Sequence, residues 1–95
     1  MSTPDIAAYL MERIAEDERI ARYHYTAAEP HIARDDPAQV IAECEARRTA
    51  VQHCQWVRDN YSPAAWMAEE VLQHLVQAYR DRPDFPPEWL PEVPW

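Results

Sequence analysis

The chain contains no glycine among its 95 residues. Glycine readily takes left-handed backbone conformations, and it forms the loops that cradle phosphate groups and the turn that presents a nucleophilic serine. The absence of glycine therefore argues against tight hairpins, phosphate-binding loops and hydrolases built on a nucleophile elbow. We expect a fold in which no backbone position requires a left-handed conformation.

Lysine is missing as well, so that all nine basic residues are arginine, and the net charge is −8. The acidic residues are spread along the chain, and the basic ones do not cluster as nucleic-acid binding requires. No run approaches the roughly 18 consecutive apolar residues of a membrane span, and the N-terminus does not resemble a signal peptide. We expect a cytoplasmic protein that binds neither nucleic acid nor a membrane.

Cysteine is scarce. Cys44 and Cys54 lie ten positions apart in one predicted helix, which turns them about 80° away from each other and separates them by two to three turns. This geometry predicts free thiols and no disulfide. The spacing does not match a zinc knuckle, and Glu70 and His74 are expected on the solvent side of their helix. We therefore expect no metal and no cofactor.

Three polar residues, each followed by proline, are the main signals of helix starts. The polar side chain can cap the first turn, and proline fits the next position because its missing N–H has no partner there. Apolar residues at helical spacing follow each pair. The pairs predict helices that start at Thr3-Pro4, Asp36-Pro37 and Ser62-Pro63.

Five of the nine prolines lie in residues 83–95, together with large apolar side chains. So many prolines exclude a long helix and favour an extended, polyproline-like segment. The predicted fold is all-α: an antiparallel three-helix bundle over residues 1–82, with a proline-rich arm over residues 83–95 packed along it. We expect the first two helices to span residues 4–25 and 36–59.

Three charged residues interrupt the apolar faces of the first two predicted helices. Asp17 lies in the first, and Arg47 and Arg48 lie in the second. Because a buried charge is costly unless it is paired, we predict an interhelical ion pair between Asp17 and one of these arginines. Two alternatives stay open: these groups reach water, or they form a polar ligand site or active site together with His24.

Aromatic residues form the second set of candidates. Trp56 and Trp66 fall outside the apolar stripes on either side of a predicted turn, and three others lie in the arm. Either the arm folds back and covers the tryptophans, or they form an exposed patch of the kind that anchors protein interfaces. The candidate interaction surface consists of Trp56, Trp66, Phe85, Trp89 and Trp95.

Several short motifs occur along the chain: Glu16-Asp17-Glu18, His31-Ile32-Ala33, Asp36-Pro37-Ala38, Glu45-Ala46-Arg47-Arg48, and the string Tyr79, Pro83, Phe85 and Trp89. Together they resemble a family of small, uncharacterised actinobacterial and actinophage proteins. The first resembles the family's acidic triplet, the next three resemble its middle, and the last resembles its closing aromatic–proline motif. The connector before Asp36 is shorter here, and Arg82 stands where the family has a histidine. The resemblance implies a bacterial or phage origin, and it carries over no functional residue because the family has no assigned activity.

These observations favour a non-enzymatic protein-interaction module with a protein partner, which includes self-association through the aromatic surface. The alternative is an acidic inhibitor or nucleic-acid mimic that blocks a basic site on a host or phage enzyme. A third hypothesis is a small enzyme or ligand-binding protein that uses Asp17, Arg47, Arg48 and His24. Nucleophilic catalysis is disfavoured, since Cys54 and the adjacent His53 point about 100° apart on a helix.

Overall fold

The computed structural model describes residues 3–23 and 37–90; most of these residues are helical, and none of them lies in a strand. The α-helices are α1 (Ile6–Tyr23), α3 (Pro37–Asn60) and α4 (Ala65–Val76). Short 3-10 turns occupy Ser62–Ala64, Gln77–Tyr79 and Pro87–Trp89. The all-α prediction is confirmed, and no residue in these ranges has a positive φ, which agrees with the absence of glycine.

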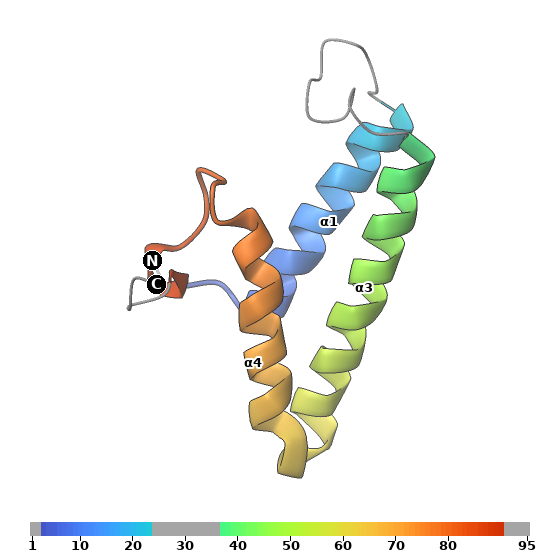
Figure 1. Ribbon diagram of the computed structural model, residues 1–95. Coiled ribbons are helices and arrows are strands. Elements are labelled where there is room, and N and C mark those ends of the chain that lie inside the picture. The colour runs from blue at the N-terminus through green and yellow to red at the C-terminus, as the bar shows by residue number, and fades with distance from the viewer. Residues whose placement is uncertain (1–2, 24–36, 91–95) are drawn as a thin grey trace.

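Figure 1 shows α1 and α3 side by side, with the chain running in opposite directions along them. α4 starts beside the C-terminal end of α3 and runs back along it as far as the N-terminal half of α1. The three helices contact one another pairwise, and the core lies where all three meet.

The helix starts differ in detail from the predicted caps. Asp5, and not Thr3, caps α1: its carboxylate accepts a hydrogen bond from the N–H of Ala8 at 3.1 Å. The hydroxyl of Thr3 donates instead to the carboxylate of Glu88. Ser62 opens a 3-10 turn, and α4 follows it with no side-chain cap. Asp36 lies outside the described residues.

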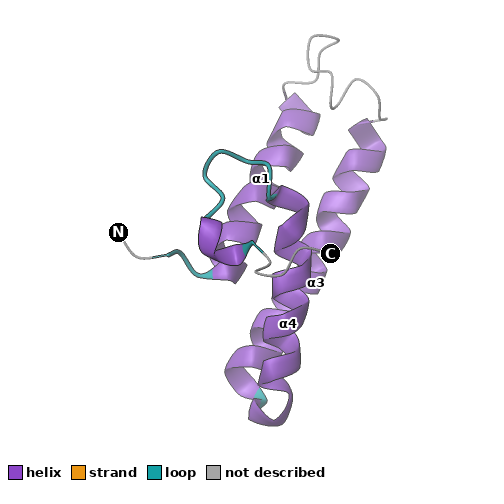
Figure 2. Cartoon of the chain, turned by 60° about the vertical axis from the view of Figure 1, so that its left-hand side comes forward, coloured by secondary structure: helices purple, strands orange, loops and turns teal. Residues whose placement is uncertain are grey.

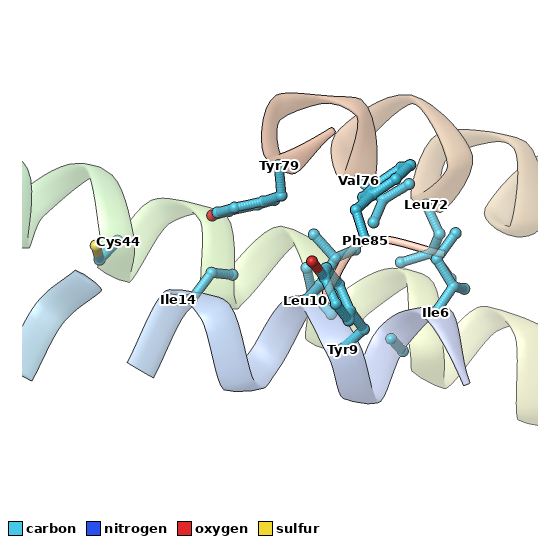
Figure 3. Packing of buried hydrophobic residues seen from close by; sticks show 11 residues of the cluster. Ile6, Tyr9, Leu10, Ile14, Cys44, Leu72, Val76, Tyr79 and Phe85 are labelled. Carbon is cyan, nitrogen blue, oxygen red and sulfur yellow. The ribbon is translucent and has the colours of Figure 1, made fainter. Parts of the chain in front are cut away.

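The core is built from the predicted apolar stripes and from side chains that the stripes do not include (Figure 3). α1 supplies Ile6, Leu10 and Ile14, and α3 and α4 add a second set of buried residues. Tyr9 and Phe85 join them, although one lies beside the α1 stripe and the other lies beyond the last helix. The remaining buried members of this cluster are Ala7, Cys44, Val51, Leu72, Val76 and Tyr79.

The segment after α4 returns to α1, as Figure 2 shows from a second direction. It is not the extended polyproline chain that the prolines suggested. Turn hydrogen bonds connect the N–H of Phe85 to the carbonyl of Arg82 and the N–H of Trp89 to the carbonyl of Pro86, each at 3.1 Å. Proline is compatible with these turns because it occupies positions whose N–H needs no partner. Residues 91–95, with Trp95, lie outside the described part of the chain.

Candidate functional site

Asp17 pairs with Arg82, which corrects the predicted pairing with Arg47 or Arg48. The guanidinium of Arg82 donates to both carboxylate oxygens of Asp17, at 2.8 and 3.0 Å. It also lies 5.3 Å from the centre of the Tyr79 ring. Arg82 therefore connects the segment after α4 to the middle of α1.

Arg48 pairs instead with Glu18, at 2.6 Å, and Glu18 also accepts a hydrogen bond from Arg22. The bond from Arg48 is the largest influence that holds the pKa of Glu18 below its usual range. Neighbouring helical residues point about 100° apart, so Asp17 and Glu18 face different elements. Glu18 faces α3, whereas Asp17 faces the segment that follows α4.

Arg47 is exposed and has no carboxylate within 4.0 Å in the described part of the chain. It lies near Tyr79 at the mouth of a small cavity between the helices. The three charged residues singled out from the sequence thus take part in three different arrangements. His24, the fourth residue of the ligand-site hypothesis, lies outside the described residues.

Tyr9, Phe85 and Trp89 form a cluster of three aromatic rings in which each pair meets edge to face. The ring centroids are 6.1 Å apart for Tyr9–Phe85, 5.2 Å for Tyr9–Trp89 and 5.7 Å for Phe85–Trp89. Such pairs contribute about 0.5–1.5 kcal/mol beyond the burial of their area. The cluster binds the C-terminal segment to the first turns of α1.

Asp84 extends this cluster with a polar contact that sequence reasoning missed. Its carboxylate accepts a hydrogen bond from the hydroxyl of Tyr9 at 2.8 Å and forms an ion pair with Arg13. Burial, and then the hydrogen bond to Asp84, raise the pKa of Tyr9 to about 12. No local pattern marks this contact, because its partners are separated by more than seventy positions.

The other aromatic candidates lie at the opposite end of α4 and are exposed. Trp56 and Trp66 keep 61% and 62% of their surface accessible, and Met67 keeps 51%. An apolar groove of about 260 Å³ lies between the two helices at this end. We call it the α3–α4 groove; its lining consists of His53, Cys54, Val57, Ala64, Met67, Ala68 and Val71.

The proposed interaction surface therefore divides into two regions. Phe85 is buried and Trp89 is half-buried in the ring cluster, whereas Trp56 and Trp66 are exposed. Trp95 is not among the described residues. The only aromatic contacts in the described ranges that involve Phe85 or Trp89 are those with each other and with Tyr9.

The described residues do not present a recognisable metal or nucleophile site. In the ranges 3–23 and 37–90, no three His, Cys, Asp or Glu side chains gather closely enough to hold a metal ion. Cys44 and Cys54 are free thiols, and burial raises the pKa of each, which makes both poor nucleophiles. None of the described helices is both long and apolar enough to cross a membrane.

Comparison with known protein families gives one match, which covers residues 3–91. The matching family, DUF6221, is described as a family of unknown function. No curated protein and no solved structure matches the chain. The expected resemblance to an uncharacterised family is confirmed at this level, and the actinobacterial or phage origin stays a prediction.

Proposed function

The chain belongs to DUF6221, a family of unknown function, and on this premise we propose that it is a non-enzymatic protein-interaction module. In this proposal the fold is an antiparallel three-helix bundle with its C-terminal arm docked on α1. The α3–α4 groove receives an amphipathic helix of a cytoplasmic protein partner. The single observation that carries the proposal is the exposed apolar lining of this groove.

The groove supplies the features that helix recognition requires. Met67 and Val71, four positions apart on α4, stand exposed beside Cys54 and Val57 on α3. Amphipathic helices bind such grooves through apolar side chains at three- to four-residue spacing. Trp56 and Trp66, exposed on the same two helices, are of the residue type that most often dominates binding energy.

Charge favours a basic partner over a second copy of this chain. The net charge of −8 repels an identical molecule and attracts a helix whose flanks carry lysine or arginine. The same net charge repels the phosphates of nucleic acid and the head groups of anionic membranes. The test must therefore distinguish self-association through the groove from binding of a foreign helix.

The alternative of an acidic inhibitor or nucleic-acid mimic gains less support. A mimic needs free carboxylates aligned on one face, but many carboxylates in the described ranges are paired within the chain. Arg13 contacts Glu12, Glu16 and Asp84. Arg58 contacts Asp5, Asp59 and Glu69.

The test compares the tagged full chain with two variants in capture from its host cells, followed by mass spectrometry. The double variant Met67→Gln, Val71→Gln makes the groove polar. Tyr23→Gln is the matched control, because it removes an exposed apolar side chain at the far end of α1. We expect the wild type and the control to retain the same partner and the groove variant to lose it.

The captured protein is then purified, and its binding is measured directly by calorimetry. A partner that binds the groove variant as well as the wild type would refute the proposed surface. A dimer of this chain that dissociates in the groove variant, seen by light scattering, would replace the foreign helix with a second copy. Loss of binding in the Tyr23→Gln control as well would indicate nonspecific hydrophobic binding and contradict the proposal.

A further inference from the structure

A second hollow, distinct from the α3–α4 groove, lies where the three helices meet. It is a cavity of about 160 Å³. Its apolar walls are formed by Leu10, Ile14, Val51, Leu75 and Ala78, and its polar lining residues are Arg47, His74 and Tyr79. Apolar cavities of about this volume stay dry and hold a benzene-sized molecule.

The hydroxyl of Tyr79 is a buried polar group of this cavity's lining, and it has no acceptor among the described residues. Tyr79 is only 4% exposed; the Arg47 side chain can donate a hydrogen bond to its hydroxyl, but no described residue accepts the hydroxyl's own proton. Figure 3 shows its ring lying over Ile14, with the oxygen directed toward the Cys44 end of the core. A buried donor that has no acceptor destabilises the fold, so a ligand that accepts a hydrogen bond here would recover that cost.

A positive charge lies beside this hydroxyl. Arg47 is exposed, lines the same cavity, and forms no ion pair with a carboxylate in the described ranges. Burial raises the pKa of Tyr79, and Arg47 works against the rise while the negative charge of Asp17 adds to it. The hydroxyl therefore stays protonated and can donate. A neutral hydroxyl donor and a guanidinium with no carboxylate partner together suit a carboxylate, which can accept from both.

From this geometry we infer that the cavity binds a small carboxylic acid whose apolar body is about the size of a benzene ring. The apolar part lies between Leu10, Ile14, Val51 and Leu75. The carboxylate lies at the mouth, where it accepts hydrogen bonds from the hydroxyl of Tyr79 and the guanidinium of Arg47. The site is separate from the α3–α4 groove and does not depend on the proposed interaction.

Benzoate is the probe, and benzyl alcohol is a neutral control of similar size. Each is titrated into the isotope-labelled full chain at neutral pH while the methyl resonances of Leu10, Ile14, Val51 and Leu75 are followed by NMR. A ligand this small should bind with a Kd on the order of 1 mM. We expect saturable shifts of these methyl groups with benzoate and at most weak shifts with benzyl alcohol.

Three variants distinguish the contribution of the two hydrogen-bond donors to benzoate binding from that of the apolar cavity. Arg47→Gln and Tyr79→Phe each remove one donor and should each weaken benzoate binding about tenfold, the effect of one charge-assisted hydrogen bond. Arg19→Gln is the matched control, since Arg19 is an exposed arginine outside the cavity. It should leave the affinity unchanged.

Several results would overturn the inference. These are shifts that do not saturate, shifts confined to the α3–α4 groove, equal binding of benzyl alcohol, and unchanged affinity in both donor variants. Arg47→Gln keeps the test decisive if Tyr79→Phe disturbs the core, because Arg47 is a surface residue. Failure here would leave the partner-capture experiment unaffected.

Discussion

Phe85 and Trp66 are both large aromatic residues close to prolines, yet 8% of the first is exposed and 62% of the second. Phe85 lies in the segment after α4 and contacts the rings of Tyr9 and Trp89 edge to face. Asp84 of the same segment contacts α1 through the hydroxyl of Tyr9. Trp66 lies in the first turn of α4, next to the α3–α4 groove. The two regions contain similar side chains in opposite environments.

The difference lies in how many elements meet at each place. The ring cluster combines α1, the C-terminal segment and the core, so each ring has a neighbour on more than one side. The α3–α4 groove is lined by α3, the Ser62–Ala64 turn and α4, and no residue of α1 contributes to it. Two helices alone leave one side of their contact open, and apolar residues on that side remain available to a partner.

The largest expected effect tests this comparison directly. Phe85→Ala should lower the free energy of unfolding by about 3–5 kcal/mol, because it empties a buried aromatic site. Trp66→Ala removes an even larger side chain from an exposed site and should change the free energy of unfolding by less than about 0.5 kcal/mol. Urea unfolding followed by circular dichroism measures both. Equal losses in the two variants would mean that the two regions do not differ as described.

If Phe85→Ala does not fold, Phe85→Leu provides the milder comparison. It keeps an apolar side chain in the core and should lose only part of the stability. A truncation after Arg82, which removes the whole arm, should expose the Tyr9 face of α1 and cause aggregation or unfolding. A truncated chain that melts like the intact one would show that the arm is not part of the fold.

The sequence predicts the helical class well because apolar periodicity and the absence of glycine are local properties. It predicts most of the α1 core residues for the same reason, since Ile6, Leu10 and Ile14 recur at helical spacing. It assigns the wrong arginine to Asp17 because the choice depends on where the segment after α4 returns. Arg82 lies sixty-five positions from Asp17, and no helical spacing connects them.

The caps show a second limit of the sequence. Asp5 and Thr3 are both suitable capping residues two positions apart, and propensity alone does not choose between them. The hydroxyl of Thr3 donates to the carboxylate of Glu88, and Glu88 lies close to Thr3 only because the C-terminal segment folds back. The sequence leaves the exposure of Trp56 and Trp66 open, because periodicity shows that they lie off the apolar stripes and does not show what covers them.

The second prediction concerns the polar contact that fixes the C-terminal segment. Tyr9→Phe keeps the ring packing and removes the hydroxyl that donates to Asp84. The hydrogen bond has a charged acceptor, so the variant should lose about 1.5–3 kcal/mol of stability in urea unfolding at neutral pH. Trp89 and Phe85 keep their contacts in this variant, which separates the polar part of the docking from the apolar part.

The same tyrosine predicts a dependence on high pH. Its pKa is raised to about 12 in the folded protein from an ordinary value of 10.0, so the folded state holds the proton more tightly. Its contribution to stability is complete below pH 10 and is lost as the pH rises from about 10 to about 12. The chain has no lysine to titrate in this window. Unfolding at pH 8 and pH 11 should show a smaller pH effect in Tyr9→Phe than in the wild type.

A smaller effect is expected from the ion pair between Arg82 and Asp17. Both side chains are partly exposed, at 34% and 19%, so solvent weakens the pair despite its two hydrogen bonds. Arg82→Gln should therefore cost about 1 kcal/mol in urea unfolding at low salt, and less at high salt. Arg47→Gln tests the alternative pairing of Asp17 and should cost less stability than Arg82→Gln, because Arg47 forms no ion pair in the described residues. A larger loss of stability in Arg47→Gln than in Arg82→Gln would indicate that Asp17 pairs with Arg47.

The smallest expected effect on stability lies in the α3–α4 groove, where two adjacent residues allow a sharp comparison. Val71 is 40% exposed and Leu72 is fully buried, although both belong to the same turn of α4. Val71→Gln should change the free energy of unfolding by less than about 0.5 kcal/mol, because glutamine favours a helix slightly more than valine does and little apolar contact is lost. Leu72→Gln places a polar amide in the core and should unfold the protein or destabilise it severely. If Val71→Gln destabilised the protein as strongly as Leu72→Gln, Val71 would be part of the core, and the groove would have no free apolar wall to offer a partner.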